Sequence, residues 1–325
     1  MMVATTGSSI VTQLDSATSQ LNRFIPIPLL VLGTIGNIFN AIIFSRRSLK
    51  RLPCSIYFLS STICNFLALY SGLITPYLNL YDLDPTSYST GVCKIRFYIR
   101  YTSITLSSWF ILLACIDRYV SSSHNARIRG YSRLTLAYRV TIITILIGIS
   151  VPFTQTFYCY EIINKSCTTR NTGCKLANDI ILLSSLSFIP PMAMVLFTLL
   201  TIRNVKRMNM STKRRHIQLV RMLFAQVMVM VILYSLPVTA QKLYSDSTAY
   251  LTGKPSIRVA IENLAQQIST NISYINNSVG FYIYILTGTL FRKEWMRVLV
   301  CQKSNAISSI HTKHQSINTN TIGKR

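Results

Sequence analysis

Three consecutive residues, Asp117, Arg118 and Tyr119, place a carboxylate, a guanidinium and a phenol at the end of an apolar run that covers residues 104–116. Charged side chains beside such a run are costly in a membrane and usually face a partner or water. The chemistry open to them is ion pairing between the carboxylate and the guanidinium. The alternative is a juxtamembrane charge pair that only fixes the depth of the helix.

The rest of the chain carries no pattern typical of a catalytic centre. Its four histidines are scattered, and it has no cluster of metal ligands, no phosphate-binding loop and no nucleophile beside a base. The sequence therefore predicts that the protein is not an enzyme and needs no cofactor.

The composition favours a membrane protein. Of the 325 residues, 50% are hydrophobic and 13% are charged, whereas about a quarter of the residues are charged in soluble domains. The net charge of +24 lies in short basic blocks between apolar stretches. This distribution disfavours a nucleic-acid partner and is typical of loops on the cytoplasmic side of a membrane. Basic inner loops also favour contact with anionic membrane lipids.

Seven apolar segments are long enough to cross a bilayer, which takes about 20 helical residues. They cover residues 24–44, 55–80, 93–121, 138–158, 176–202, 217–243 and 261–286. Basic loops alternate with polar or acidic loops, which predicts an outside N-terminus and an inside C-terminus. The fold class is therefore an all-α seven-transmembrane helix bundle.

Polar segments flank the predicted bundle. Residues 1–23 are expected to be an extracellular N-terminal tail without a removable signal peptide, and residues 302–325 a disordered cytoplasmic tail. Between them, residues 24–301 form the transmembrane domain. Its last part is a predicted amphipathic surface helix with Phe291, Trp295, Val298 and Leu299 on one face. Cys301 follows as a candidate palmitoylation site; the alternative is an ordinary reduced cysteine.

Cysteine spacing predicts a bridge on the outer side. Cys93 and Arg118 are separated by roughly 37 Å along a helix, so they lie on opposite sides of the membrane. A cysteine on the oxidising side is expected to form a disulfide with the loop after the fourth span. The candidates are Cys159, Cys167 and Cys174. Cys167 is favoured because it leaves about six helical turns before Pro191, and Cys174 is the alternative.

An ordered set of short features runs through the spans: Gly36-Asn37, Cys93, Asp117-Arg118-Tyr119, Pro152, Pro191, Leu236-Pro237, and Tyr284 followed by Phe291-Arg292. With these features at these spacings, the chain resembles a rhodopsin-like (class A) G-protein-coupled receptor over residues 24–301. Its sixth and seventh spans look most like those of invertebrate neuropeptide receptors of the FMRFamide type.

The resemblance implies a role for several of these residues. Asp117, Arg118, Tyr119 and Tyr284 would form the cytoplasmic switch for a heterotrimeric G protein. Prolines inside helices remove a backbone hydrogen bond, so Pro191 and Pro237 are expected to act as hinges. Arg118 is expected to pair with Asp117 at rest and to be released when the inner cavity opens.

Other positions depart from the family pattern. Leu199 and Ile217 stand where the family has a tyrosine and an acid that contact the switch arginine. Further departures are Asn65, Ile142, Ser235 and Gly280-Phe281. Because Arg118 lacks its usual partners, raised basal activity is expected.

The third span carries Arg96 and Arg100 on one face near its outer end, at the depth where family pockets lie. With no acid there, a small cationic amine is disfavoured. The resemblance implies a peptide-like extracellular ligand, and the hypothesis from the residues is that the two arginines receive an anionic or carbonyl-rich group of it. Gln241, Tyr244, Asn271 and Tyr274 would complete the site. Alternatively, the arginines extend to lipid headgroups or pair with Asp179 or Glu262.

Two other functions remain open. A seven-span transporter or channel would need acids or broken helices along a pathway, but the inner acid Asp117 lies at the end of its span. A chemosensory receptor would share the fold. Asn164 begins a glycosylation sequon in an outer loop.

Overall fold

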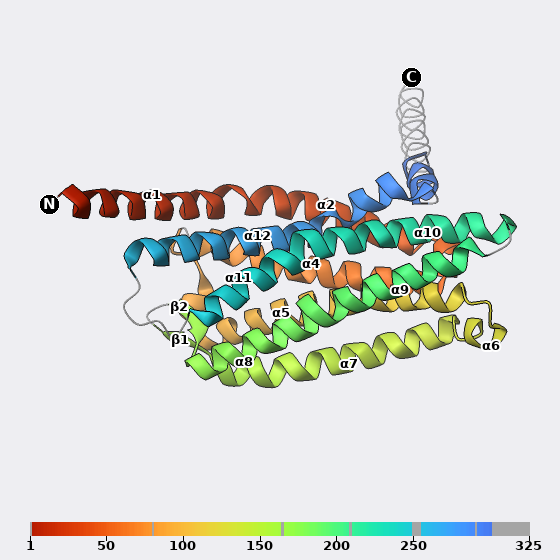
Figure 1. Cartoon of the computed structure of the whole chain (residues 1–325), viewed down its shortest axis with the longest axis horizontal. Coiled ribbons are helices and arrows are strands. Elements are labelled where there is room, and N and C mark those ends of the chain that lie inside the picture. The colour runs from red at the N-terminus through yellow and green to blue at the C-terminus, as the bar shows by residue number, and fades with distance from the viewer. Residues whose placement is uncertain are drawn as a thin grey trace, which may run out of the picture.

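A bundle of long helices forms the body of the protein (Figure 1). The structure, a computed structural model, describes residues 2–79, 81–163, 166–207, 210–248, 255–289 and 291–300. The first four spans are α2 (Pro26–Phe44), α4 (Pro53–Asn79), α5 (Thr90–Ser121) and α7 (Leu134–Cys159). The fifth joins α8 (Thr172–Leu182), η2 (Leu183–Phe188) and α9 (Ile189–Lys206). The sixth joins α10 (Met210–Val229), η3 (Met230–Ser235) and α11 (Leu236–Ser247), and the seventh is α12 (Ser256–Thr287). The predicted seven-helix bundle is confirmed.

Six helical segments among the described residues are long and apolar enough to cross a membrane: Ser9–Phe44, Pro53–Asn79, Thr90–Ser121, Leu134–Cys159, Thr172–Lys206 and His216–Ser245. The seventh helix, α12, is 32 residues long and is not among these six segments. Its amide side chains include Asn271 and Asn277, which are buried. Part of the polar character of α12 therefore lies inside the bundle.

The N-terminal segment is helical. Helix α1 (Met2–Phe24) leads into α2 and runs beside α12 (Figure 1). The sequence predicted only a polar tail here. Residues 8–24 contain neither proline nor glycine, so nothing in this stretch interrupts a helix that continues from the first span.

Apolar side chains also cover the outside of the bundle. On α7, Ile142, Ile143, Leu146 and Ile147 are all exposed. The interior, by contrast, holds polar contacts such as Ser61 Oγ to Ser107 Oγ at 2.9 Å. Exposed apolar faces around a partly polar interior are what a helix bundle in lipid requires.

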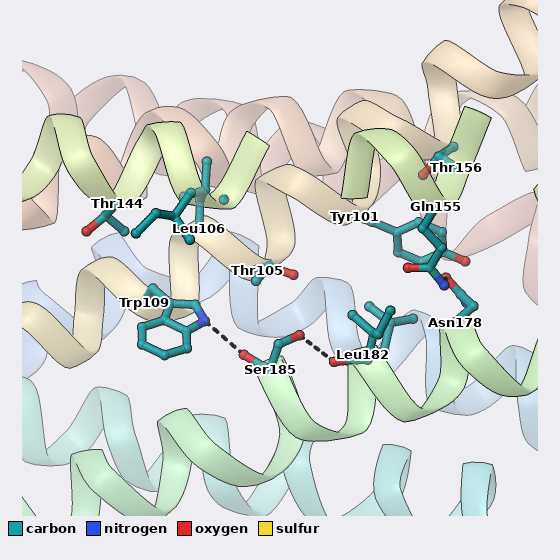
Figure 2. A pocket seen from close by; sticks show the side chains of 13 residues that line it. Tyr101, Thr105, Leu106, Trp109, Thr144, Gln155, Thr156, Asn178, Leu182 and Ser185 are labelled. Atoms are coloured by element: carbon teal, nitrogen blue, oxygen red, sulfur yellow. Dashed lines mark hydrogen bonds between the residues drawn. The ribbon is translucent and has the colours of Figure 1, made fainter. Parts of the chain in front are cut away.

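Two spans contain a π-helical turn directly before proline. The turn η2 precedes Pro190 and Pro191, and η3 precedes Pro237. Proline lacks the N–H that would close a regular turn, so the helix widens. In the first of these turns, the Ser185 carbonyl accepts a hydrogen bond of 3.0 Å from Trp109 Nε1 of α5 (Figure 2).

Short elements lie at the two ends of the bundle. At one end, strands β1 (Tyr160–Ile163) and β2 (Ser166–Thr169) form an antiparallel hairpin in which Ile162 faces Cys167. A 3₁₀ turn, η1 (Pro85–Ser87), belongs to the loop between α4 and α5. At the other end, α3 (Arg47–Lys50) and α6 (Ala126–Arg129) carry basic residues (Figure 1). The hairpin was not predicted, although its β-branched isoleucines and threonines favour strands.

Residues 291–300 form the predicted amphipathic helix after the seventh span. Phe291 is buried, with its ring centroid 5.5 Å from that of Phe44. The Trp295 ring lies 4.3 Å from that of Phe39. Val298 is also buried, but Leu299, which was predicted on the same face, is exposed. The helix therefore packs through its first two turns.

Candidate functional site

The inner end of α5 holds a buried ion pair. Arg118 donates to Asp117 Oδ2 from Nε at 3.2 Å and also from Nη2. The other carboxylate oxygen, Asp117 Oδ1, accepts a hydrogen bond of 2.6 Å from Ser132 Oγ in the loop after α6. Both charged residues are buried. This is the arrangement expected of a resting switch, with Ser132 as an additional restraint. A single serine in a loop gives no sequence signal for such a role.

The two tyrosines of the predicted switch occupy different surroundings. The ring of Tyr119 lies 5.6 Å from that of Phe197 on α9. Tyr284 is buried on α12, with ring centroids 5.3 Å from Phe58 and 5.6 Å from Phe291. Tyr284 therefore joins the inner halves of two spans to the surface helix, and it does not contact the ion pair directly.

The two positions where the family has partners for the switch arginine face away from the bundle. Leu199 is 54% exposed on α9, and Ile217 is exposed on α10. Instead, α9 is linked to the end of α5 by Asn204 Nδ2, which donates to Ser122 Oγ at 3.4 Å. Restraint on Arg118 therefore comes from its neighbour Asp117, which Ser132 holds in place.

We expect Ser132→Ala to raise ligand-independent signalling by about fivefold, since a hydrogen bond is worth about 1 kcal/mol. The substitution removes the second contact of Asp117 and so weakens the resting pair. Basal G-protein activation at matched surface expression measures the effect. Ser123→Ala is the control, because Ser123 Oγ accepts a hydrogen bond from Asn125 N in the same loop. Equal basal activity in both variants would contradict the restraint.

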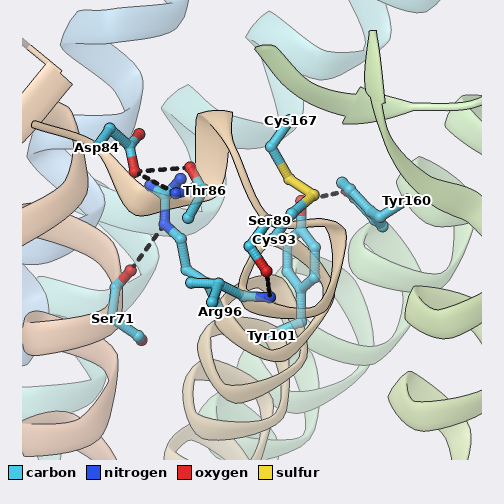
Figure 3. Close-up of a disulfide and its surroundings, with 10 residues drawn as sticks. Ser71, Asp84, Thr86, Ser89, Cys93, Arg96, Tyr101, Tyr160 and Cys167 are labelled. Carbon is cyan, nitrogen blue, oxygen red and sulfur yellow. Dashed lines mark hydrogen bonds between the residues drawn. A yellow bond between two sulfur atoms is a disulfide. The ribbon is translucent and has the colours of Figure 1, made fainter. Parts of the chain in front are cut away.

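Two disulfides fasten the outer hairpin. Cys93 at the start of α5 is bonded to Cys167 of β2, with a Cα–Cα distance of 5.8 Å (Figure 3). Cys174, the alternative partner for Cys93, is instead bonded to Cys159. The sequence had suggested Cys159 and Cys174 only as partners of Cys93, so this second bridge was missed. Together the bridges hold the hairpin over the outer end of α5.

Arg96 lies beneath this hairpin. Its Nε donates to the Ser71 carbonyl of α4 at 3.2 Å (Figure 3). It lines a cavity of about 320 Å³ together with Asp84, Thr86 and Gln267. Asp84 Oδ1 accepts hydrogen bonds from Thr86 N and Thr86 Oγ1. Arg96 therefore has a backbone partner and shares its cavity with an acid.

Arg100 lies one turn deeper and faces aromatic rings. Its guanidinium is 5.5 Å from the ring centroid of Tyr274 and 5.9 Å from that of Tyr101. Arg100 Nε is buried and has no hydrogen-bond partner among the described residues. Tyr274 is 1% exposed, and its hydroxyl likewise has no partner in the described part of the chain. Asn271, one turn earlier on α12, is buried with an unpartnered Nδ2.

The sequence did not predict the setting of Tyr101. Its hydroxyl lies 2.8 Å from the hydroxyl of Tyr160 at the base of the hairpin. Burial raises the pKa of the Tyr160 phenol, so this group stays neutral. Tyr101 thus contacts Arg100 through its ring and the disulfide-bonded hairpin through its hydroxyl.

The predicted residues of α11 are placed differently. Gln241 is half-buried, whereas Tyr244 is exposed and its hydroxyl accepts a hydrogen bond of 3.2 Å from Arg258 Nη2. The nearby Lys242 Nζ lies 2.5 Å from Asp179 Oδ1 and ties α11 to α8. Lys242 was not singled out from the sequence.

The acids proposed as alternative partners for the arginines pair with other residues. Asp179 pairs with Lys242, and Glu262 pairs with Arg258 at 3.2 Å. Within the described residues, the structure thus brings Arg100 and Tyr274 together, and Asn271 lies on the same helix as Tyr274. Arg96 and Tyr244 have separate polar partners.

We expect Gly72→Ala to destabilise the receptor by about 1–3 kcal/mol, the usual effect of overpacking. A Cβ at Gly72 on α4 would clash with the buried Tyr274 ring. Thermal unfolding of the purified protein measures the loss. Gly91→Ala is the matched control, because an added Cβ there meets only Ser89 Oγ at 3.9 Å. Equal melting temperatures for the two variants would show that Tyr274 does not depend on this close approach.

Three predicted features lie outside the described residues. They are the sequon asparagine Asn164, the palmitoylation candidate Cys301 and the tail 302–325. The hinge candidates are described: Pro191 is buried near the start of α9, and Pro237 is the second residue of α11.

Comparison with known proteins identifies the family. The profile described as "7 transmembrane receptor (rhodopsin family)" matches residues 36–284. Human C-C chemokine receptor type 1 is 23% identical over 275 residues, which are 81% of this chain and 75% of that protein. The neuromedin U receptor homolog nmur-2 of Caenorhabditis elegans is 29% identical over 118 residues, 36% of this chain and 28% of that protein. The chain therefore belongs to the rhodopsin family of seven-transmembrane receptors, which are multi-pass membrane proteins that signal through G proteins and are not enzymes.

Proposed function

We propose that the protein is a plasma-membrane receptor activated by an extracellular peptide-like ligand. Neuropeptides are the ligand class that we propose to test first. The observation that carries this proposal is the Arg100 guanidinium, which lies in the outer half of the bundle against the Tyr274 and Tyr101 rings. Its Nε has no hydrogen-bond partner among the described residues. A buried cation of this kind is stabilised when a ligand supplies an anion or carbonyl oxygens.

The surroundings of Arg100 favour a peptide over a small amine. The amide Nδ2 of Asn271 and the Tyr274 hydroxyl offer further unpartnered polar atoms nearby on α12. The nearby acids Asp179 and Glu262 already pair with Lys242 and Arg258. A carboxylate or a run of peptide carbonyls therefore suits the site better than an ammonium group. The name of the nematode relative refers to neuromedin U, which suggests a peptide ligand.

The membrane orientation follows from charge and disulfides. The end with both bridges faces outside, because disulfides persist in oxidising compartments. The basic elements α3 and α6 then face the cytoplasm. In this arrangement residues 1–23 are an extracellular N-terminal segment, residues 24–301 the receptor domain and residues 302–325 a cytoplasmic tail.

The inner face is suited to its proposed partners. A hollow of about 670 Å³ beside α6 is lined by Arg127, Arg133 and Arg139. These cations would attract the anionic lipids of the inner leaflet. Release of Arg118 from Asp117 would expose a cationic group to a helix of a heterotrimeric G protein, while the prolines after η2 and η3 allow the inner ends to move.

A screen of amidated peptides tests this function. Cells that express the full chain are exposed to the library, and calcium and cAMP are recorded with Arg118→Ala as the signalling control. The expected result is a response to one peptide class in the wild-type receptor alone. A response to non-peptide volatile or small organic compounds, with none to peptides, would favour a chemosensory receptor of the same fold instead.

A further inference from the structure

A second cavity lies beside α5 and shares Tyr101 with the surroundings of Arg100. It has a volume of about 370 Å³ and is enclosed by α5, α7, α8 and η2. This size falls in the range of about 300–1,000 Å³ that is typical of small-molecule pockets. None of the residues proposed for the extracellular ligand lines it.

The cavity has one polar end and one mainly apolar end, where the Thr144 hydroxyl donates to the Val140 carbonyl (Figure 2). At the polar end, Gln155 Nε2 donates to Asn178 Oδ1 at 3.3 Å, and Asn178 is 5% exposed. Each amide carries a second polar atom besides this hydrogen bond, Gln155 Oε1, an acceptor, and Asn178 Nδ2, a donor. Leu106 and Trp109 lie toward the other end (Figure 2).

Charge is absent from the residues described in this lining. The head of a phospholipid or a fatty acid carries a charge that would have no counter-ion here, and burying it would be costly. A neutral hydroxyl, in contrast, can accept from one amide and donate to the other. The chemistry therefore favours an amphipathic molecule with a single hydroxyl and a hydrocarbon body.

Access to the cavity is from the bilayer. Ile147, which lines it, is 60% exposed on the lipid-facing side of α7, and the neighbouring Ile143 is also exposed. Gly148 keeps α7 close to α5, because a Cβ there would clash with the Leu106 side chain. A membrane component can thus reach the cavity from the lipid-facing side of α7 without passing the disulfide-bonded hairpin.

We propose that this cavity binds a membrane sterol, with the sterol hydroxyl between Gln155 and Asn178 and the ring system along Leu106 and Trp109. The site touches two groups that matter for signalling. Tyr101 lines the cavity, and its ring also contacts the Arg100 guanidinium. Ser185, which lines the cavity too, belongs to the π-helical turn η2. Bound sterol would therefore bias both the ligand site and the fifth span.

The test uses a diazirine derivative of cholesterol and the full-length receptor in phosphatidylcholine nanodiscs. After irradiation, labelled peptides are located by mass spectrometry. We expect label on α5, α7 and α8 residues that line the cavity. Ile181→Trp fills the cavity and is expected to reduce this label by about tenfold. Ile142→Trp is the control, since Ile142 is exposed to lipid on α7 and does not line the cavity.

Two further measurements separate a sterol site from general lipid contact. Cholestene, which lacks the hydroxyl, is expected to compete about fivefold more weakly than cholesterol, and Asn178→Leu is expected to remove this difference. Equal competition by cholestene in the wild-type receptor would overturn the role of the two amides. Stronger competition by oleate than by cholesterol, or equal label loss in Ile181→Trp and Ile142→Trp, would overturn the sterol site. These readouts are binding measurements, so they do not depend on the proposed peptide ligand.

Discussion

Replacing Arg100 by alanine is expected to lower the potency of a peptide agonist by roughly 10- to 100-fold, because hydrogen bonds to a charged group are worth about 1.5–3 kcal/mol. The guanidinium is packed against Tyr274 and Tyr101, so its position is fixed before the ligand arrives. Potency is read from concentration–response curves for G-protein activation at matched surface expression.

Companion variants separate the charge of Arg100 from its geometry. Arg100→Lys keeps the charge but loses the planar fork, so it is expected to recover potency only in part. Lys94→Ala removes a positive charge from the same outer end of α5 and should leave potency unchanged. If Arg100→Ala also left potency unchanged, the arginine would be a headgroup anchor, as the alternative interpretation of the sequence holds.

The second large effect is expected at the inner end, where Arg118→Ala should reduce agonist-driven G-protein activation by more than about tenfold. Arg118 is buried and bonded to Asp117, so its removal takes away the group that the switch releases. Agonist binding should persist, since the outer site lies at the far end of α5. Radioligand binding and G-protein activation on the same membranes separate these outcomes.

The control for Arg118→Ala is another cation at the same end of the bundle. Arg129 of α6 is exposed, and its Nη1 donates to the Ser123 carbonyl at 3.5 Å. Arg129→Ala removes equal charge and should signal normally. Full agonist-driven activation by Arg118→Ala, at wild-type surface levels, would remove Arg118 from the mechanism.

The spans were predictable because apolar length and basic loops are local properties of the chain. The π-helical turns were only partly predictable. The prolines indicated irregular helix at Pro191 and Pro237, but the widened turn depends on how neighbouring helices, such as the one that carries Trp109, satisfy the freed carbonyls. Helix α1 was missed because its polar composition carries no membrane signal.

The candidate sites show where sequence reasoning ends. Asp117 and Arg118 are neighbours in the chain, so their pairing could be expected, whereas the contact with Ser132 depends on how the loop after α6 folds back. The contact of Arg100 with Tyr274 depends on the rotation of α5 and α12 about their axes. A small rotation of α11 likewise decides that Tyr244 faces Arg258.

The central claim is that an outside ligand controls nucleotide exchange on a G protein through Arg118. The most direct measurement uses purified receptor in nanodiscs, purified heterotrimeric G proteins of each class, and the most active peptide from the screen. Guanine-nucleotide exchange is recorded with and without peptide. The account predicts that peptide accelerates exchange on at least one G protein by wild-type receptor, and that Arg118→Ala binds the peptide without this acceleration. Saturable peptide binding with unchanged exchange on every class would contradict it.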